Sequence, residues 1–275
     1  TLLKDASKIK TKLKTLQEKF KASEATYTKM LLSVPNIPTN DTPIGKDDTA
    51  NVVIKKVGKV IKTNFKQQHH EDLGVALNII DKERAAKVSG SRFAFIKNDL
   101  VLLEFAMVQY IFSVLTDEKV LKKIFKKAGI QISSKPFIPV LPPVFVRSSV
   151  FTAMDRLEPR EDKYELSGDD QFLIGSAEHT LGPMHMNETI LEADLPIRYI
   201  GFSTCFRREA GTYGKDMKGI VRMHQFDKLE METFTTRENG LLEHEALVAI
   251  QEYIMQELEM PYQVVAISTG DMGKP

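Results

Sequence analysis

The hydrophobic residues at the start of the chain recur in alternating steps of four and three. They are Leu2, Ala6, Ile9, Leu13, Leu16, Phe20, Tyr27, Met30 and Val34, and the series is broken once, at Ser23. A repeat of 3.5 residues places a single apolar stripe along a helix and is typical of a coiled-coil seam. The pattern predicts a helix from about residue 2 to 32 whose stripe needs a partner, and no second helix of this kind appears in the sequence.

Residues 34–45 end this helix, because three prolines and a glycine cannot continue it. We predict a domain boundary here, with half of a coiled-coil arm at 1–34 and a second domain at 35–275. Within the second domain, helical patterns cover 98–115, 116–129 and 237–260. Extended patterns cover 52–65, 136–146, the start of 171–186, much of 205–234, and 262–269.

This order is strand-rich and mixed, without the regular strand–helix alternation of a parallel fold. The absence of Gly-x-Gly-x-x-Gly after a strand disfavours a dinucleotide-binding fold. The absence of Gly-x-x-x-x-Gly-Lys-Ser/Thr excludes a P-loop nucleotidase. We therefore expect an α+β fold, in which a mainly antiparallel sheet is flanked by helices and preceded by the N-terminal coiled-coil helix.

Composition adds few constraints. The chain has 275 residues and a net charge of +1, so a nucleic-acid partner has to be argued from local clusters of charge. The single cysteine, Cys205, excludes an internal disulfide framework and favours a cytoplasmic protein. The most apolar stretch, 100–115, contains Glu104 and Gln109 and is too short to span a membrane.

One cluster of charge lies on the predicted first helix. Residues 1–33 hold eight lysines and three acids, which gives this stretch a charge of +5. Lysines on a helix often form only a solvated face, and the alternative is an arm that binds nucleic-acid phosphates. The residues alone leave both interpretations open.

A second concentration of charge lies in residues 205–234. Arg207 and Glu209 are two apart and would share one face of a strand. A later strand would present Arg222, His224, Phe226, Lys228 and Glu230 on one face. Antiparallel pairing through the connection at 211–219 would bring both sets to the same side of the sheet.

Such a surface suits a ligand that carries phosphates, a flat base and an amine. Arginine binds phosphate with two parallel hydrogen bonds, an aromatic ring stacks on a base, and a carboxylate accepts from an amine. The alternative is a solvated hairpin with cross-strand ion pairs. The basic, glycine-rich connection and the aromatic residue within the charged face favour the binding site.

The stretch FRREAGTYGKDMKGIVRMHQFDKLEM closely resembles motif 2 of the class II aminoacyl-tRNA synthetases, in the form found in seryl-tRNA synthetases. That form is Phe-Arg-x-Glu-Ala-Gly, a glycine-rich loop, and then Arg-x-His-Gln-Phe-x-Lys-x-Glu. Other stretches agree in order: PNIPTNDTPIGKDD, KVSGSRFAF, PFIPVLPPVFV in the place of motif 1, FLIGSAE, LPIRYIGFSTCFRREAG and LEMPYQVVAISTGDMG. The resemblance covers nearly the whole chain. It implies a class II synthetase-like sheet, and it makes the first helix similar to the returning helix of a tRNA-binding arm.

The resemblance implies a role for each matching residue of the ATP site. Arg207 would hold the α-phosphate of ATP and act in catalysis, and Glu209 would contact adenine. Arg222 would hold the outer phosphates, and Phe226 would stack on the base. The expected set is completed by Arg208, which stands where the family often has a small residue, and by Met223.

The serine pocket implied by the resemblance consists of Ser176, Ala177, Glu178, Arg207 and Glu230. The family usually has Thr-x-Glu where this chain has Ser176-Ala177-Glu178. The hydroxyl is therefore retained and the methyl group is lost, which predicts a slightly looser pocket.

The implied activity is that of a serine–tRNA ligase with ATP and Mg²⁺ as cofactors. The serine carboxylate attacks the α-phosphate, and the seryl group then passes to the 3′ end of tRNA(Ser). Both steps depend on alignment and charge neutralisation more than on a protein nucleophile. The expected partners are tRNA(Ser), L-serine and a second copy of the chain, which would pair through Phe137–Val146 and the helix before it; no membrane is expected.

The chain departs from the family at its ends. Family members continue past TGDMG with metal-binding acids and the arginine of motif 3, and they have a first arm helix that is absent here. We therefore expect a chain that is incomplete at both ends, with metal ligands beyond Pro275. An inactive synthetase-like protein that binds RNA or dimerises is the main alternative. A ligase that acts on a carrier protein is disfavoured by the arm.

Overall fold

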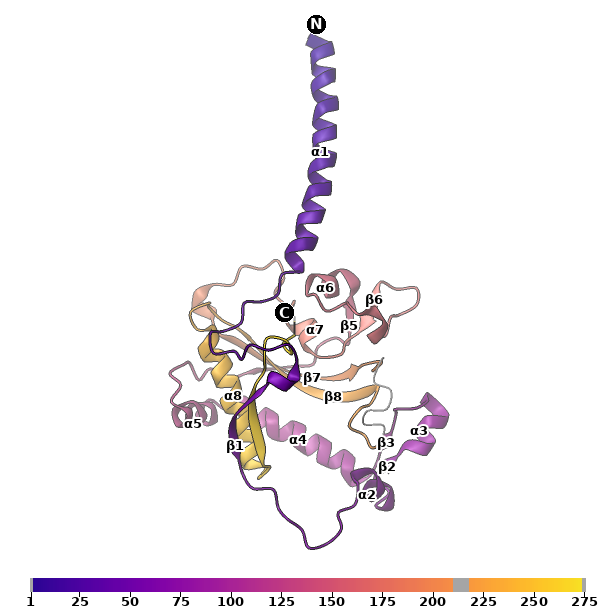
Figure 1. Ribbon diagram of the computed structural model, residues 1–275, viewed down its shortest axis with the longest axis vertical. Coiled ribbons are helices and arrows are strands. Elements are labelled where there is room, and N and C mark those ends of the chain that lie inside the picture. The colour runs from indigo at the N-terminus through magenta and orange to yellow at the C-terminus, as the bar shows by residue number, and fades with distance from the viewer. Residues whose placement is uncertain (1, 210–217, 274–275) are drawn as a thin grey trace. The chain divides into compact units, whose positions relative to one another are not determined.

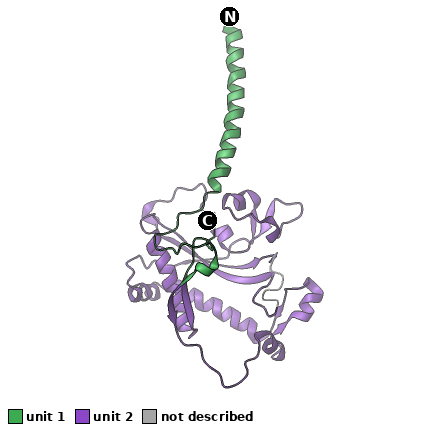
Figure 2. Cartoon of the chain, in the orientation of Figure 1, with its two compact units in different colours: residues 1–52, 266–275 green, residues 53–265 purple. Residues whose placement is uncertain are grey.

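The computed structural model describes residues 2–209 and 218–273 (Figure 1). They form two compact units, residues 1–52 with 266–275 and residues 53–265 (Figure 2). In the first unit, helix α1 (Leu2–Leu32) contains no buried residue. Its apolar stripe is open to solvent, with Leu13 53% and Phe20 66% exposed. The prediction of one long N-terminal helix is confirmed.

The remainder of the first unit joins the stretch before residue 52 to the end of the chain. The N–H of Thr269 donates to the carbonyl of Pro43 at 2.9 Å. The N–H of Ser268 donates to the side chain of Asn51 at 2.8 Å, and the amide of Asn51 donates to Asp271 at 2.8 Å. A 3-10 turn, η1 (Asp48–Ala50), lies between these contacts.

The second unit is organised around a three-stranded sheet with the order β4–β7–β8. Strand β7 (Ile197–Phe206) pairs antiparallel with β8 (Gln225–Phe234) along its full length. Strand β4 (Ile138–Val140) runs parallel to β7. Three smaller pairs are β1 (Val52–Val57) with β9 (Tyr262–Ala266), β2 (Ile80–Asp81) with β3 (Phe95–Ile96), and β5 (Phe145–Arg147) with β6 (Gln171–Leu173).

Three helices pack on one face of this sheet and form the main core (Figure 1). They are α4 (Asp99–Leu115), α5 (Glu118–Ala128) and α8 (Gly240–Glu257). The start of α5 is capped by Asp117, whose carboxylate accepts from the N–H groups of Lys119 and Val120. The core of this face contains Leu115, Leu121, Phe125, Ile200, Ala246 and Ile250.

The opposite face of the sheet is covered by the short helix α7 (Glu178–Leu181). Ala177 and Leu181 pack there against Tyr199. The remaining helices and turns of this unit are α2 (His70–Ala76), α3 (Lys82–Ser89), α6 (Ser148–Ala153), η2 (Arg160–Asp162) and η3 (Glu192–Asp194). The α+β architecture with a mainly antiparallel sheet and flanking helices is therefore confirmed.

Among the described residues, no single helix is both long and apolar enough to cross a membrane. Helices α4 and α5 meet the length and composition criteria only as a pair, and the pair is bent by 75°.

A buried ion pair joins the sheet to α8. Arg198 on β7 is 1% exposed, and its Nε and one terminal nitrogen donate to the two carboxylate oxygens of Glu243 at 2.9 and 2.7 Å. The other terminal nitrogen donates to the carbonyl of Lys135 at 2.7 Å. The guanidinium group also lies over the rings of Phe125 and Phe137, at 5.6 and 5.8 Å from their centroids.

We predict that Glu243→Ala lowers the free energy of unfolding by about 3–5 kcal/mol, because it leaves the buried guanidinium of Arg198 without its counter-charge. Urea unfolding followed by circular dichroism measures the change. Glu83→Ala provides the matched control, because it breaks an exposed ion pair with Lys87 on α3 and should change stability little. Equal losses in the two variants would contradict the role given to the buried pair.

Candidate functional site

The face of the β7–β8 pair that α7 covers is polar along most of its length. Residues on one face of an antiparallel pair alternate along each strand and lie opposite each other across it. Phe226, Lys228, Glu230 and Glu232 on β8 lie opposite Cys205, Ser203, Gly201 and Tyr199 on β7. At Gly201, a Cβ atom would lie 2.6 Å from Leu181 Cδ1, so glycine allows α7 to approach the sheet beside Glu230.

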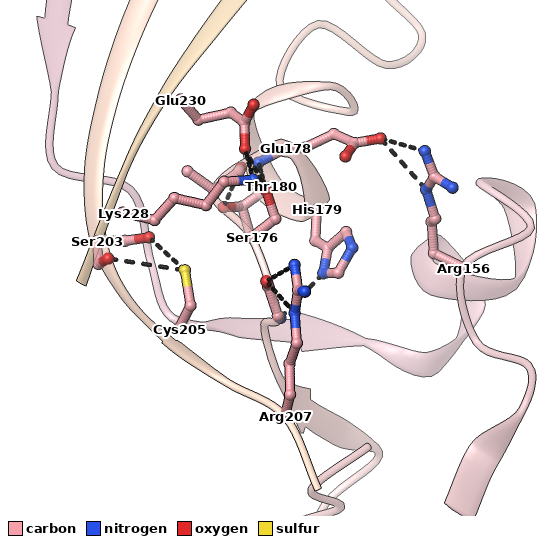
Figure 3. A network of polar contacts seen from close by, with 12 residues as sticks. Arg156, Ser176, Glu178, His179, Thr180, Ser203, Cys205, Arg207, Lys228 and Glu230 are labelled. Atoms are coloured by element: carbon pink, nitrogen blue, oxygen red, sulfur yellow. Dashed lines mark hydrogen bonds and ion pairs between the residues drawn. The ribbon is translucent and has the colours of Figure 1, made fainter. Parts of the chain in front are cut away.

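Ser176 connects the start of α7 to strand β8 (Figure 3). Its hydroxyl donates to the carboxylate of Glu230 and accepts from Lys228 Nζ at 3.0 Å. Lys228 also forms an ion pair with Glu230. Ser176 is buried, whereas the side chains of Lys228 and Glu230 are 33% and 23% exposed. One hydroxyl, one ammonium group and one carboxylate therefore converge at a partly open position.

Two neighbours of Ser176 have different surroundings. Ala177 is fully buried against Leu181 and Tyr199, and its side chain serves packing. Glu178 accepts two hydrogen bonds from Arg156, at 2.5 Å from a terminal nitrogen and 3.2 Å from Nε. The Glu178 carboxylate is thus held by a cation from outside the predicted set of site residues.

Arg207 lies immediately after β7 and points back toward α7 (Figure 3). Its Nε and one terminal nitrogen donate to the carbonyl of Gly175 at 3.2 and 3.1 Å, and its guanidinium lies 5.2 Å from the ring centroid of Phe226. The N–H of Gly175 donates to His179 Nδ1 at 3.1 Å. Burial, reinforced by the surrounding cations, lowers the pKa of His179 to about 4, so the ring stays neutral and keeps its acceptor.

Glu209 and Arg222 are brought together by an ion pair, not by a shared strand face. Strand β7 ends at Phe206 and β8 begins at Gln225, so the expected extension of the alternation to residues 207, 209, 222 and 224 is wrong. Glu209 has a φ of 50°, which lies outside the β region. Its carboxylate accepts from a terminal nitrogen of Arg222 at 3.1 Å.

The two other predicted ATP-site residues differ in exposure. Arg208 is exposed, and its guanidinium lies 5.9 Å from the ring centroid of Tyr164, while its N–H donates to the carbonyl of Asp162 at 3.2 Å. These contacts give a physical reason for a large planar cation at this position. Met223 is buried, with 8% exposure.

Glu232 is a third carboxyl group on the site face. It lies two residues beyond Glu230 on β8, and its Oε1 is 3.4 Å from the place where a Cβ on Gly182 would stand. The pKa of Glu232 is raised to about 7, chiefly by burial and also by the nearby carboxylates of Glu178 and Glu230, against the opposing effects of Lys228 and Arg156.

Sequence reasoning missed several residues of this site. The strand pattern predicts that Lys228 lies on the same face as Glu230 but gives it no role, and Glu232 continues the same two-residue alternation, so the pattern could have identified Glu232 as a site residue. Arg156 and His179 carry no comparable signal, because their roles depend on how α6 and α7 pack. No group of three or more His, Cys, Asp or Glu side chains within residues 2–209 and 218–273 is arranged to hold a metal ion.

The sequence of the chain is similar to a known protein domain and to known enzymes. Residues 162–274 match the tRNA synthetase class II core domain (G, H, P, S and T). The chain is 38% identical over its whole length to a serine–tRNA ligase of Nitrosopumilus maritimus, of which it covers 61%. It is 40% identical over 88% of its length to a serine–tRNA ligase of Petrotoga mobilis, of which it covers 54%.

The fold of the chain is similar to that of a solved structure. The crystal structure of seryl-tRNA synthetase from Pyrococcus horikoshii complexed with ATP superposes with a TM-score of 0.84 and 34% identity, covering 100% of this chain and 62% of that one. The chain therefore spans between half and two thirds of the length of these relatives.

We predict that Glu232→Gln flattens the pH dependence of stability between about pH 4.5 and 7. The folded protein keeps the Glu232 proton up to about pH 7, whereas the ordinary value of 4.5 applies to the unfolded chain. In this interval the folded state binds more protons, so the free energy of unfolding falls as the pH rises. Glutamine cannot ionise, so the variant should gain stability relative to the unchanged protein as the pH rises through this interval.

Urea unfolding at several pH values from 4 to 8 tests this expectation. Glu83→Gln on the exposed surface of α3 changes the same functional group without burial and serves as the control. Curves for Glu232→Gln and the unchanged protein that run parallel across the interval would contradict the prediction.

Proposed function

We propose that this chain, which is a homologue of serine–tRNA ligases and carries a class II tRNA synthetase core domain, forms the part of such an enzyme that binds ATP and L-serine. The proposed reaction activates serine as seryl-adenylate and transfers it to the 3′ end of tRNA(Ser), in the cytoplasm. The observation that supports the proposal most directly is the convergence of Ser176, Lys228 and Glu230 beside Arg207 on one sheet face.

The proposed serine pocket matches the groups of that amino acid. Serine carries an ammonium group and a hydroxyl, and Glu178 and Glu230 supply carboxylates that accept from both. The hydroxyl of Ser176 adds a further hydrogen-bonding group. Arg207 provides the cation for the serine carboxylate. The side chain of Ala177 packs against Leu181 and Tyr199 and so holds the backbone between Ser176 and Glu178 in place.

The proposed ATP site lies at the end of β7 and the start of β8. Arg207 would contact the α-phosphate and Arg222 the outer phosphates, with Arg208 adding positive charge nearby. Phe226 would stack on the base and Glu209 would accept from its amino group, with Met223 buried behind. The donor set fits a polyphosphate, because Arg207 and Arg208 are adjacent in the chain and the side chain of Arg222 is bonded to Glu209, the residue that follows them. Mg²⁺ would bind together with the phosphates of ATP and supply further neutralisation of their charge.

The residues would promote the reaction by alignment and charge. A serine carboxylate oxygen forms a bond to the α-phosphorus, and the bond from that phosphorus to pyrophosphate breaks. Arg207 can contact both the carboxylate and the phosphate, so it would hold the reacting atoms together and stabilise the charge that develops between them. A tRNA hydroxyl then attacks the seryl carbonyl and releases AMP.

The division of the chain into an arm at 1–34 and a catalytic domain at 35–275 is part of this proposal. The exposed apolar stripe of α1 would pack against a second arm helix, and its lysines would attract the phosphates of tRNA.

A homodimer is the second part of the proposal. The helix directly before β4 is α5, but its apolar residues Leu121, Ile124 and Phe125 are buried, so we place the interface on α4 and β4 in place of α5. Leu102, Leu103 and Phe105 on α4 are 68%, 57% and 60% exposed. Ile138 on β4 and Leu141 just after it are 47% and 78% exposed. Helix α4 and strand β4 both contact β7. Exposed apolar surface of this kind is typical of an interface, and a second copy of the same chain would cover it.

We predict that Arg207→Ala lowers the turnover of serine-dependent ATP–pyrophosphate exchange by about a hundredfold or more, equivalent to about 3–4 kcal/mol for one charge-stabilising contact.

Glu230→Gln should mainly raise the KM for serine and weaken the preference for serine over alanine, because the Glu230 carboxylate binds the substrate in its ground state. Exchange kinetics of the complete gene product with serine and alanine measure both effects. Near-normal turnover in Arg207→Ala, or an unchanged preference in Glu230→Gln, would show that this face is not the active site.

We predict that Phe105→Glu converts a dimer into a monomer at micromolar concentration, because it places a charge in the proposed apolar interface. Light scattering coupled to gel filtration measures the molecular mass. Val88→Glu is the matched control, because Val88 on α3 is equally apolar and 74% exposed but lies outside α4 and β4. A monomeric unchanged protein, or equal masses for the Phe105→Glu and unchanged proteins, would contradict the dimer.

A further inference from the structure

The segment from His69 to Ile96 has no role in the site described so far. It contains α2, β2, α3 and β3 and is called the α2–β3 segment below. Its contacts reach the chain on both sides of residues 210–217, which lie between β7 and β8. Both groups of contacts fall within the unit formed by residues 53–265.

On the side that leads into β8, three consecutive residues are bound to the start of α2. Lys218 Nζ forms an ion pair with Asp72 at 2.7 Å. The N–H of Gly219 donates to Glu71 at 2.6 Å, and the N–H of Ile220 donates to His70 Nε2 at 3.0 Å. Three neighbouring side chains of α2 therefore take one donor each from residues 218–220.

The close approach depends on glycine at position 219. Gly219 is buried and has a φ of +95°, a conformation that L side chains rarely adopt. A Cβ atom there would lie 2.2 Å from His70 Nε2. On the other side of this contact, Lys82 forms an ion pair with Glu71 at 2.9 Å and so holds the carboxylate that accepts from Gly219.

On the side that leaves β7, the contact is made by Arg92. A terminal nitrogen of Arg92 donates to the carbonyl of Glu209 at 3.1 Å. The carbonyl of Arg92 accepts from the N–H of His224 at 3.0 Å, and the rings of Phe93 and His224 lie 5.3 Å apart. His224 in turn contacts the carbonyl of Arg207 through Nδ1 at 2.9 Å.

These contacts enclose two residues of the proposed ATP site. Glu209 is held through its carbonyl by Arg92. Arg222 lies two residues after Ile220, which is bound to α2, and two residues before His224, which is bound to Arg92. The backbone on either side of the Arg222–Glu209 ion pair is thus attached to the α2–β3 segment and not only to the sheet.

We propose that the α2–β3 segment positions the nucleotide-binding residues: His70, Glu71 and Arg92 fix the backbone around Glu209 and Arg222 and so set the direction in which these side chains meet ATP. This inference rests on the proposed function, because it assigns a purpose to the ATP site defined there. His70 and Glu71 are positioning residues, since they accept hydrogen bonds from the backbone N–H groups of Ile220 and Gly219.

The test uses His70→Ala and Glu71→Ala in the complete gene product. Hydrogen exchange followed by mass spectrometry should show faster exchange of the amides in 218–226, because the acceptors for Gly219 and Ile220 are removed. Isothermal titration should show ATP binding weakened by about tenfold, since displaced binding groups lose part of their contact energy. Serine affinity should stay within about twofold, because Ser176 and Glu230 do not contact this segment.

Two further variants control the experiment. Glu83→Gln lies in the same segment on exposed α3 and should leave both ATP affinity and hydrogen exchange of 218–226 unchanged. Glu71→Gln keeps an oxygen acceptor for the Gly219 N–H and should bind ATP better than Glu71→Ala. A general loss of folding would weaken serine and ATP binding together and would overturn the positioning role.

The outcomes separate this inference from the proposed function. If Arg222→Ala weakens ATP binding but His70→Ala and Glu71→Ala do not, the inference is wrong and the ATP site stands. Unchanged hydrogen exchange of 218–226 in both alanine variants also overturns it. If the unchanged protein does not bind ATP, the proposed function fails and the inference fails with it. Selective loss of ATP affinity with faster exchange supports it.

Discussion

The ion pair between Arg198 and Glu243 fixes the strand on which the rest of the structure is built. It joins β7 to α8, while the hydrogen bond from Arg198 to the carbonyl of Lys135 ties in the chain that leads to β4. Because side chains alternate along a strand, a defined position for Arg198 on the helix-covered face also determines which residues of β7 and β8 point the other way. If β8 shifted by one residue in its pairing with β7, its charged side chains would point into the core. Burying these charges without partners would cost more free energy than the fold could offset.

The sequence predicted the local features well and the long-range contacts poorly. The 3.5-residue spacing predicted α1, and the two-residue alternation predicted that Phe226, Lys228 and Glu230 share a face; both follow from periodicities that need no tertiary information. The alternation failed at Glu209 and Arg222, because a positive φ and an ion pair replace the strand there. Arg156, Arg92 and His70 could not be found from the sequence, since their partners lie 22 to 150 residues away and depend on how short elements pack.

Burial gives similar groups on this face different protonation behaviour. Desolvation lowers the pKa of His179 to about 4, so its ring is uncharged at neutral pH, and it is the main cause that raises the pKa of Glu232 to about 7, so this carboxyl group stays mostly protonated below that pH. Lys228 and Glu230 are more open and are paired with each other. The paired charges therefore lie on the accessible part of this face, and the groups with shifted pKa values lie on its buried part. Ser176 donates to Glu230 in the first part, and the N–H of Gly175 donates to His179 in the second.

Several charged groups in the described part of the proposed site already have a partner within the protein. Arg222 binds Glu209, Lys228 binds Glu230, Arg156 binds Glu178, and Arg207 donates to the Gly175 carbonyl. The phosphates of ATP and the charged groups of the amino acid would therefore replace these internal partners when they bind. Such exchange lowers the net gain in affinity, because existing hydrogen bonds are lost, but it keeps each side chain near its working position. For a reaction whose barrier lies in the alignment of two anionic groups, orientation that is already present before binding contributes more to rate than additional ground-state affinity would.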